Sequence, residues 1–236
     1  MFILAIDTAG KTSSVALVDE SSVVARIGLD LGKTHSQKLL PMVDALLQLA
    51  EISLADLDAV AVTVGPGSFT GLRIGLATVK AWSQALQLPL VAVGTLEAAA
   101  VAVSGEGYVC PIFDARKNQV YCALFKDGQQ IWPAQAVSPQ QLAQRLASLA
   151  GPILFCGDAV GIYDDIFAAG LGDNFRPDAE DKRFFLAEGA ALLARERYQS
   201  GQTLLPEQIE PFYLRRSEAE VKRFSDQEKG NTCDER

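Results

Sequence analysis

Histidine is the scarcest chemically active residue in this chain, because His35 is the only one among 236 residues. Any site that requires two imidazoles is therefore excluded, which removes zincin-type proteases and most histidine-rich metal centres. A Ser-His-Asp triad is restricted to His35, and no nucleophile elbow accompanies it. The four cysteines form no CxxC pair, so neither a zinc ribbon nor a thioredoxin-like motif is expected.

Long apolar runs and an excess of basic residues are also missing. No apolar stretch approaches the ~20 residues that a membrane span needs, and no basic segment precedes the first apolar run. We therefore expect a cytoplasmic protein that does not contact a membrane. The net charge of −8 argues against tight binding of nucleic acid by this chain alone, because phosphate contacts need clustered Lys and Arg.

The order of the expected elements repeats along the chain. Each half begins with an apolar strand that ends at an aspartate, Asp7 or Asp114, and later reaches a strand that ends at a glycine, Gly65 or Gly157. The first half is predicted to contain strands 2–6, 14–18 and 23–29, helix 36–50, strand 59–64, helix 70–86, strand 90–93 and helix 96–103. The second half is predicted to contain strands 109–113, 120–125 and 131–132, helix 140–149 and strand 153–156. The pattern favours two similar α/β lobes with mixed sheets and flanking helices over a chance repeat of common elements.

The lobe boundary is expected near the turn at 104–107. This gives a first lobe over 1–106 and a second lobe over 107–215. A helix is predicted over 184–198, and the sequence leaves open whether it packs back on the first lobe. Residues 216–236 hold few apolar side chains, so a flexible tail is predicted there.

One glycine-rich segment is the most specific motif in the chain. It reads GPGSFTGLRIG over residues 65–75. Around it occur, in chain order, ILAIDT at 3–8, THS at 34–36, LLP at 39–41, DAR at 114–116 and YLR at 213–215. Together these segments resemble the TsaB (YeaZ) family, and the match extends from residue 2 to about residue 215.

The resemblance implies a fold and a role. It implies two ribonuclease-H-like lobes of the actin-like and sugar-kinase ATPase fold, which agrees with the repeat. It also implies a non-catalytic partner of TsaD, the enzyme that transfers a threonylcarbamoyl group to the tRNA adenosine beside the anticodon. The implied assemblies are a heterodimer with TsaD, an ATP-dependent ternary complex with TsaE, and a homodimer when TsaD is absent. Contact with tRNA is then expected only through the complex.

The segment that resembles the metal-binding part of TsaD lacks metal ligands. TsaD carries metal-binding histidines near a Leu-Glu segment that follows the strand after the glycine motif. Here that region reads VGTLEAA over 93–99, with Thr95 and alanines where histidines would be expected. Imidazole ligation of iron or zinc is then unavailable. We therefore expect no catalytic residue, no metal and no cofactor in this chain.

The nucleotide cleft implied by the fold is expected to be degenerate. Asp7 and Asp114 occupy the metal-binding positions of the two lobes, but the turns after them contain little glycine, which hinders close approach of the backbone to phosphates. Turn formation or strand-end capping is the alternative role for both aspartates. The residues assigned to this cleft are Asp7, Thr8, Gly10, Asp114, Arg116 and Gly157.

A partner interface is expected on two helices of the first lobe. The apolar set of helix 36–50 is wider than one sheet requires, and Gly71 and Gly75 lie one turn apart, where another helix could approach. Full burial of helix 36–50 in its own lobe is the alternative. Leu39→Glu with Val43→Glu is then expected to abolish TsaD binding without unfolding. The residues assigned to the interface are His35, Leu39, Leu40, Val43, Leu46, Leu47, Gly71, Leu72, Arg73, Gly75 and Thr78.

Other functions stay open. An active ATPase or small-molecule kinase of the same fold would use Asp7 and Asp114 to bind magnesium. A ribonuclease-H-like nuclease needs several carboxylates around paired metals, and the first lobe shows no clear second acid. A peptidase is the weakest alternative, because no triad order is present. The glycine motif lacks P-loop spacing, so anion binding at its turn is less favoured than a structural role.

Overall fold

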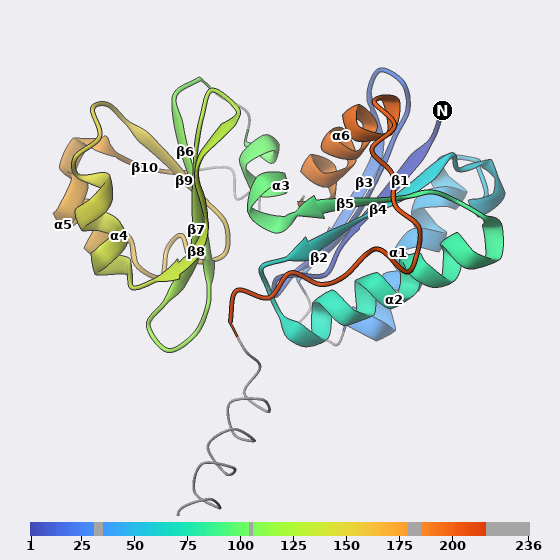
Figure 1. Cartoon of the computed structure of the whole chain (residues 1–236), viewed down its shortest axis with the longest axis horizontal. Helices are drawn as coiled ribbons and strands as arrows, with labels where there is room; N and C mark the ends of the chain where they lie inside the picture. Colours follow the sequence, from blue (N-terminus) through green and yellow to red (C-terminus); the bar gives the residue numbers. More distant parts are fainter. Residues whose placement is uncertain (31–34, 104–105, 179–185, 216–236) are drawn as a thin grey trace, which may run out of the picture.

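Two mixed five-stranded sheets form the two lobes of the protein (Figure 1). The computed structural model describes residues 1–30, 35–103, 106–178 and 186–215. The first sheet contains β1 Ile3–Asp7, β2 Ser13–Val18, β3 Val23–Leu29, β4 Ala59–Gly65 and β5 Leu90–Gly94. The second contains β6 Tyr108–Asp114, β7 Val120–Lys126, β8 Gln129–Val137, β9 Ile153–Cys156 and β10 Phe175–Pro177.

Both sheets have the same topology. The strand order is β3-β2-β1-β4-β5 in the first lobe and β8-β7-β6-β9-β10 in the second. In each, the first three strands pair antiparallel, the fourth pairs parallel with the central strand, and the fifth pairs parallel with the fourth. This confirms the predicted two-lobed α/β fold with mixed sheets. The short strand β10 and the helix before it are absent from the sequence prediction.

The first sheet is covered on both faces. Helices α1 (His35–Leu49) and α2 (Phe69–Leu86) cover one face, and α6 (Leu186–Gln199) covers the other. The alternation of side chains along a strand explains this, because Leu4 and Ile6 point toward α1 and α2 while Ile3 and Ala5 point toward α6. A helix that follows the second sheet in sequence therefore packs on the first one (Figure 1).

Small residues bring α6 close to its neighbours. Its buried face consists of Leu186, Ala187, Gly189, Ala190, Ala191 and Ala194. A Cβ added to Gly189 would lie 2.0 Å from the carbonyl oxygen of Ala98 in α3 (Thr95–Ala102), so only glycine allows this approach. Because α3 also packs on β6 and β7, it lies between the two sheets.

The second sheet is covered by α4 (Pro139–Leu146) and α5 (Asp164–Leu171) on its outer face. Ser138 and Gln141 form a capping box at the start of α4, and Pro139 occupies its first turn. Short 3₁₀ turns occur at Leu54–Asp56 and Gly172–Asn174. No helix in the described residues is long and apolar enough to span a membrane.

The segment after α6 returns along the first lobe and ends at the second. Leu204 forms an isolated bridge with Leu90, and the Phe212 amide donates to the Val64 carbonyl at 2.7 Å. The Arg215 guanidinium then donates to the Ala115 carbonyl at 2.6 Å. The predicted tail, part of the predicted boundary turn and the first two residues of predicted helix 184–198 lie outside the described residues.

Candidate functional site

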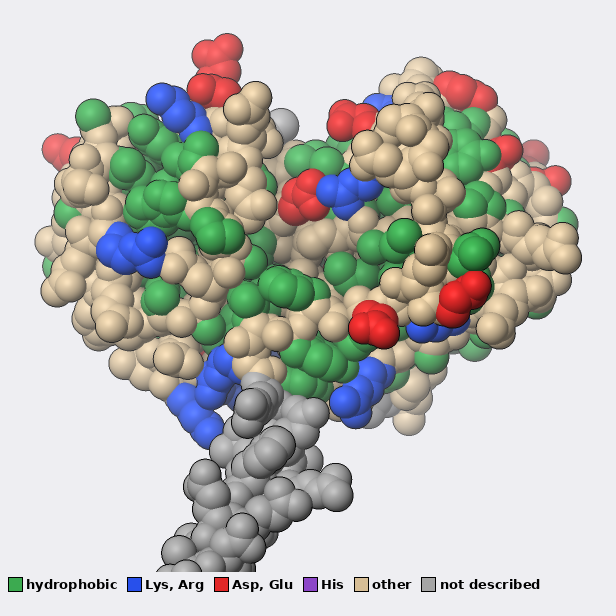
Figure 2. Space-filling view, in the orientation of Figure 1, with side chains coloured by type: hydrophobic (Ala, Val, Ile, Leu, Met, Phe, Trp, Pro, Cys, Tyr) green, Lys and Arg blue, Asp and Glu red, His purple; other side chains and the backbone are tan. Residues whose placement is uncertain are grey.

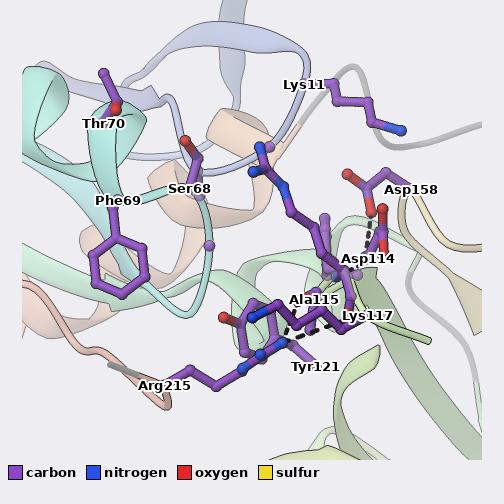
Figure 3. Close-up of a pocket in the computed structure, with 15 residues that line it drawn as sticks. Lys11, Ser68, Phe69, Thr70, Asp114, Ala115, Lys117, Tyr121, Asp158 and Arg215 are labelled. Atoms are coloured by element: carbon purple, nitrogen blue, oxygen red, sulfur yellow. Dashed lines mark hydrogen bonds between the residues drawn. The ribbon is translucent and has the colours of Figure 1, made fainter. Parts of the chain in front are cut away.

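A cavity of about 360 Å³ lies between the lobes (Figure 3). The β1–β2 turn and the start of α2 form its first-lobe wall, and the end of β6 with the β6–β7 turn forms the opposite wall. Its lining consists of Ala9, Gly10, Lys11, Gly67, Ser68, Phe69, Thr70, Phe113, Asp114, Ala115, Arg116, Lys117, Tyr121, Asp158 and Arg215. The two strand-end aspartates have different relations to this cavity, because Asp114 lines it and Asp7 does not.

Asp7 is fully buried beside the cavity rather than open to it. Its Oδ1 accepts hydrogen bonds from the Thr63 hydroxyl at 2.6 Å and the Ala9 amide at 3.2 Å. Its Oδ2 has no hydrogen-bond partner among the described residues. Burial, opposed by the two hydrogen bonds and slightly reinforced by the charge of Asp158, raises the pKa of Asp7 from 3.8 to about 6. This carboxyl is therefore poorly placed to hold a metal ion in the cavity.

The glycine motif explains why Asp7 is covered. A Cβ on Gly71 would lie 1.9 Å from the Thr8 carbonyl oxygen, and one on Gly75 would lie 2.6 Å from the Thr8 hydroxyl. A Cβ on Gly67 would lie 2.5 Å from the Ala9 carbonyl oxygen. The Thr8 hydroxyl also donates to the Gly71 carbonyl at 2.7 Å. The glycines therefore let α2 lie directly on the β1–β2 turn of its own lobe.

Asp114 is half-buried and stabilises its own turn. Its Oδ1 accepts from the Arg116 amide at 2.8 Å, and its amide donates to Asp158 Oδ1 at 2.8 Å. Arg116, Lys117 and Asn118 have φ values of 59°, 53° and 55°, so three non-glycine residues adopt the left-handed conformation in succession. A phosphate at this turn would therefore meet long side chains before it reached the backbone. The capping alternative describes Asp114 well.

The predicted cleft residues are only partly brought together. Gly10, Asp114 and Arg116 line the cavity, whereas Asp7, Thr8 and Gly157 do not. Gly157 has a φ of 106°, and a Cβ there would lie 2.3 Å from the Ile112 carbonyl oxygen. Packing within the second lobe therefore requires a glycine at position 157.

Several residues that line the cavity were not predicted from the sequence to belong to the cleft. They are Lys11, Phe69, Lys117, Tyr121, Asp158 and Arg215. A signal for two of them was present, because Lys11 and Lys117 each follow a strand-end aspartate by three or four positions in the duplicated pattern. Arg215 reaches the cavity only because the returning C-terminal segment carries it there, and no local pattern indicates this.

Most of the predicted interface on α1 is part of the core. Leu39, Val43, Leu46 and Leu47 are at most 6% exposed and pack in the first lobe's hydrophobic cluster. The alternative of burial within the lobe therefore describes these four side chains, and the expected docking role for them is corrected. Leu40 differs, since 55% of its surface is exposed.

His35 joins the start of α1 to the β1–β2 turn. Its Nε2 donates to the Gly10 carbonyl at 3.1 Å, so Nδ1 accepts from the Ser13 hydroxyl. Burial lowers the pKa of the imidazole, although the bond to Gly10 opposes that shift. This arrangement gives His35 a positioning role within the first lobe.

The predicted interface residues on α2 divide into buried and surface groups. Gly71, Leu72 and Gly75 are buried against the first lobe. Arg73 is exposed, and its Nε donates to the Tyr213 hydroxyl at 3.0 Å. Thr78 is half-buried and donates to the Ile74 carbonyl at 2.9 Å.

Comparison with known proteins gives close relatives of this chain. The family model described as "TsaD: tRNA N6-adenosine threonylcarbamoyltransferase" matches residues 30–223. The tRNA threonylcarbamoyladenosine biosynthesis protein TsaB of Bacillus subtilis is 35% identical over 230 residues, which cover 94% of this chain and 97% of that protein.

Solved structures are also similar to this chain, and they show its fold. YeaZ from Pseudomonas aeruginosa is 31% identical and superposes with a TM-score of 0.75, over 90% of this chain and 99% of that one. An inorganic polyphosphate/ATP-glucomannokinase from Arthrobacter superposes with a TM-score of 0.53 at 14% identity, over 83% and 99% of the two chains. The second likeness shows the fold alone, which is the actin-like and sugar-kinase type.

Proposed function

The chain belongs to the TsaB (YeaZ) family of tRNA threonylcarbamoyladenosine biosynthesis proteins, and from that membership we propose that it is a non-catalytic partner of TsaD and TsaE. In this proposal TsaD transfers the threonylcarbamoyl group to the tRNA adenosine, and TsaE joins an ATP-dependent complex. The chain itself reaches tRNA through the assembly, forms a homodimer when TsaD is absent, and works in the cytoplasm.

The packing of α3 is the observation that carries the non-catalytic role. By resemblance, the metal-binding histidines of TsaD correspond to the start of this helix. Here Thr95, Ala98 and Ala99 are at most 2% exposed. The backbone of α6 approaches so closely that Gly189 has no room for a Cβ. A metal centre at this place would therefore have neither ligands nor space.

The alternative is an active ATPase or small-molecule kinase. It would require Asp7 and Asp114 to share a magnesium ion in the cavity. The burial and raised pKa of Asp7 weigh against it, because that carboxyl does not line the cavity and is costly to ionise. Asp114 remains the one feature that favours it, since its side chain does face the open cavity.

The outer face of α1 and α2 is the proposed docking surface for TsaD. With the predicted interface residues Leu39, Leu46 and Leu47 buried, the exposed apolar side chains of these helices include Leu40 and Leu49 on α1 and Ala77, Ala81 and Leu86 on α2. Alanines on an exposed helix face permit close approach of a partner helix. The same surface is proposed for the homodimer.

The docking surface is tested by the double substitution Leu40→Glu with Ala77→Glu in the full chain. We expect loss of TsaD co-purification and of modified tRNA in a reconstituted reaction, with an unchanged circular dichroism spectrum. Ile131→Glu changes a similarly exposed apolar residue of the second lobe and should leave both readouts intact. Retained TsaD binding by the double variant would contradict the proposed surface. Leu39→Glu with Val43→Glu is unsuitable, because both side chains belong to the core.

A further inference from the structure

Positive charge is concentrated around the interlobe cavity, although the whole chain has a net charge of −8. The lining contains four basic side chains and two carboxylates. Lys11 comes from the first lobe, Lys117 comes from the opposite wall, and Arg215 comes from the returning C-terminal segment (Figure 3). Figure 2 shows basic side chains along the edge where the two lobes meet. The cavity is thus a local exception to the acidic character of the chain.

These basic side chains are not neutralised by their neighbours. Within the described residues, Lys11, Arg116, Lys117 and Arg215 form no ion pair with a carboxylate. The Arg215 guanidinium is held by the backbone carbonyls of Ala115 and Arg116, at 2.6 and 3.4 Å. Neutral acceptors fix its position without cancelling its charge.

The two carboxylates of the lining are occupied by the protein itself. Asp114 accepts from the Arg116 amide, and Asp158 accepts from the Asp114 amide. Both therefore stabilise the second-lobe wall. The four basic side chains outnumber them, so the net charge of the lining favours an anion.

The first-lobe wall adds features that suit the same kind of ligand. The 18-residue helix α2 begins at the cavity, and its N-terminal end carries a partial positive charge. Phe69 lines the cavity and stacks on Tyr213, with ring centroids 4.4 Å apart. Tyr121 also lines the cavity; burial raises the pKa of its hydroxyl, and the charges of the nearby Arg215 and Arg116 partly oppose that shift. Aromatic faces next to basic side chains are typical of nucleotide-binding surfaces.

We propose that this cavity binds a phosphate-bearing ligand through basic side chains and without a metal ion. The binding groups are Lys11 from the first lobe, Arg116 and Lys117 from the second, and Arg215 from the C-terminal segment. Metal-free binding follows from the chemistry of the lining, because basic side chains stand where phosphate would sit and Asp7 is withdrawn from the cavity. The phosphate could belong to a free nucleotide or to the backbone of an RNA strand, and both present the same chemistry.

Calorimetric titration of the full chain with inorganic pyrophosphate, in the presence of EDTA, tests this proposal. We expect saturable binding that EDTA does not abolish. Lys11→Gln and Lys117→Gln should each weaken binding about tenfold, the usual effect of losing one charge-assisted contact. Lys80→Gln, on α2 but outside the cavity lining, should leave the affinity unchanged. Thermal unfolding of each variant verifies that the fold is retained.

A second titration distinguishes the two sources of phosphate. A short single-stranded RNA that binds with the same sensitivity to Lys11→Gln and Lys117→Gln, and competes with pyrophosphate, identifies RNA backbone as the ligand. If pyrophosphate binds and the RNA does not, the ligand is a small phosphate compound. The proposal is overturned if neither probe binds, if binding appears only with magnesium, or if the two lysine variants bind like the native chain. These failures would leave TsaD co-purification intact, so the partner role is tested separately.

Discussion

The two lobes share one topology but treat their equivalent aspartates in opposite ways. In the first lobe, α2 follows β4 directly and lies on the β1–β2 turn, so Asp7 is removed from water. In the second lobe, the helix after β9 is only 8 residues long and begins at Asp164, and Asp114 stays open to the cavity. A duplicated fold has thus produced one closed strand end and one open strand end.

The difference shows which element determines access to the cleft. Gly67, Gly71 and Gly75 allow α2 to contact the first turn through backbone atoms. The second turn has no such cover and is held by Arg215 from the C-terminal segment. The polar side chains that can contact a ligand in the cavity therefore come chiefly from the second lobe, together with Lys11 and with Arg215 of the C-terminal segment.

Gly71→Ala is expected to have the largest effect, because it acts on the contact that closes the first lobe. The added Cβ would lie 1.9 Å from the Thr8 carbonyl oxygen, and backbone cannot move away cheaply. We expect the free energy of unfolding to fall by about 3 kcal/mol or more, which exceeds the ~1 kcal/mol that alanine gains in a helix. Urea denaturation of the purified variant measures this change.

Gly170→Ala is the matched control in a second-lobe helix. There the new Cβ would meet only the Ala143 Cβ, at 3.0 Å, so a small shift can relieve the contact. We expect a change within about 1 kcal/mol. Equal losses for the two variants would mean that the first lobe is no more tightly closed than the second.

The fold could be predicted from the sequence more completely than the contacts of the glycine motif could. The apolar strands, the strand-end aspartates and the repeated order of strands and helices are patterns in the sequence, and they correctly predicted most elements and the two-lobed fold. The motif indicated close helix packing, but sequence alone could not show that the contacted element is the turn at Thr8. That contact joins segments more than 60 residues apart, and its partner is a backbone carbonyl with no sequence signature.

Asp7→Asn probes the closed strand end through its charge. The folded chain keeps a proton on Asp7 up to about pH 6, whereas an ordinary aspartate releases it near 3.8. Stability from this group is therefore present at low pH and is lost as the pH rises through that interval. Near pH 8 we expect Asp7→Asn to raise the free energy of unfolding by about 1–2 kcal/mol, less than the full shift implies, because the new amide finds no acceptor. Chemical denaturation across a pH series measures the change.

The open strand end supplies the control. Asp114→Asn keeps an oxygen that can accept from the Arg116 amide, and the side chain is partly hydrated. We expect its free energy of unfolding near pH 8 to stay within about 1 kcal/mol of the native value. A loss of stability in Asp7→Asn near pH 8 would show that the Asp7 carboxylate is ionised and well bound, which would favour the ATPase alternative.

The cavity itself was harder to predict than the fold. Asp114, Arg116 and Gly10 were identified because they follow a strand in a recognisable pattern. The basic lining was missed because total charge was summed over each lobe, and an acidic sum conceals four basic side chains that folding gathers from three segments. Proximity in space, rather than composition, determines the local charge.

His35→Ala is expected to have the smallest effect on the free energy of unfolding. It tests the contact that holds the β1–β2 turn against α1. His35 ties Gly10 and Ser13 to α1, a contact that the second-lobe turn replaces with Arg215. Near pH 8, loss of these bonds should lower the free energy of unfolding by about 1 kcal/mol.

The pH dependence of this variant separates a positioning role from simple packing. Burial lowers the pKa of His35 below 6.5, so the unfolded chain binds the proton more readily and native stability falls as the pH drops below that value. The difference in free energy of unfolding between the native chain and His35→Ala should therefore become smaller in acid. Only the native chain contains the buried imidazole that resists protonation. Asp7 changes the free energy of unfolding in the opposite direction as the pH falls from about 6 to 3.8, so the comparison is best made in the Asp7→Asn background. A gap that widens in acid would mean that His35 is stabilised as the imidazolium, with Nδ1 donating to the Ser13 hydroxyl oxygen instead of accepting from it, while the bond to the Gly10 carbonyl stays unchanged.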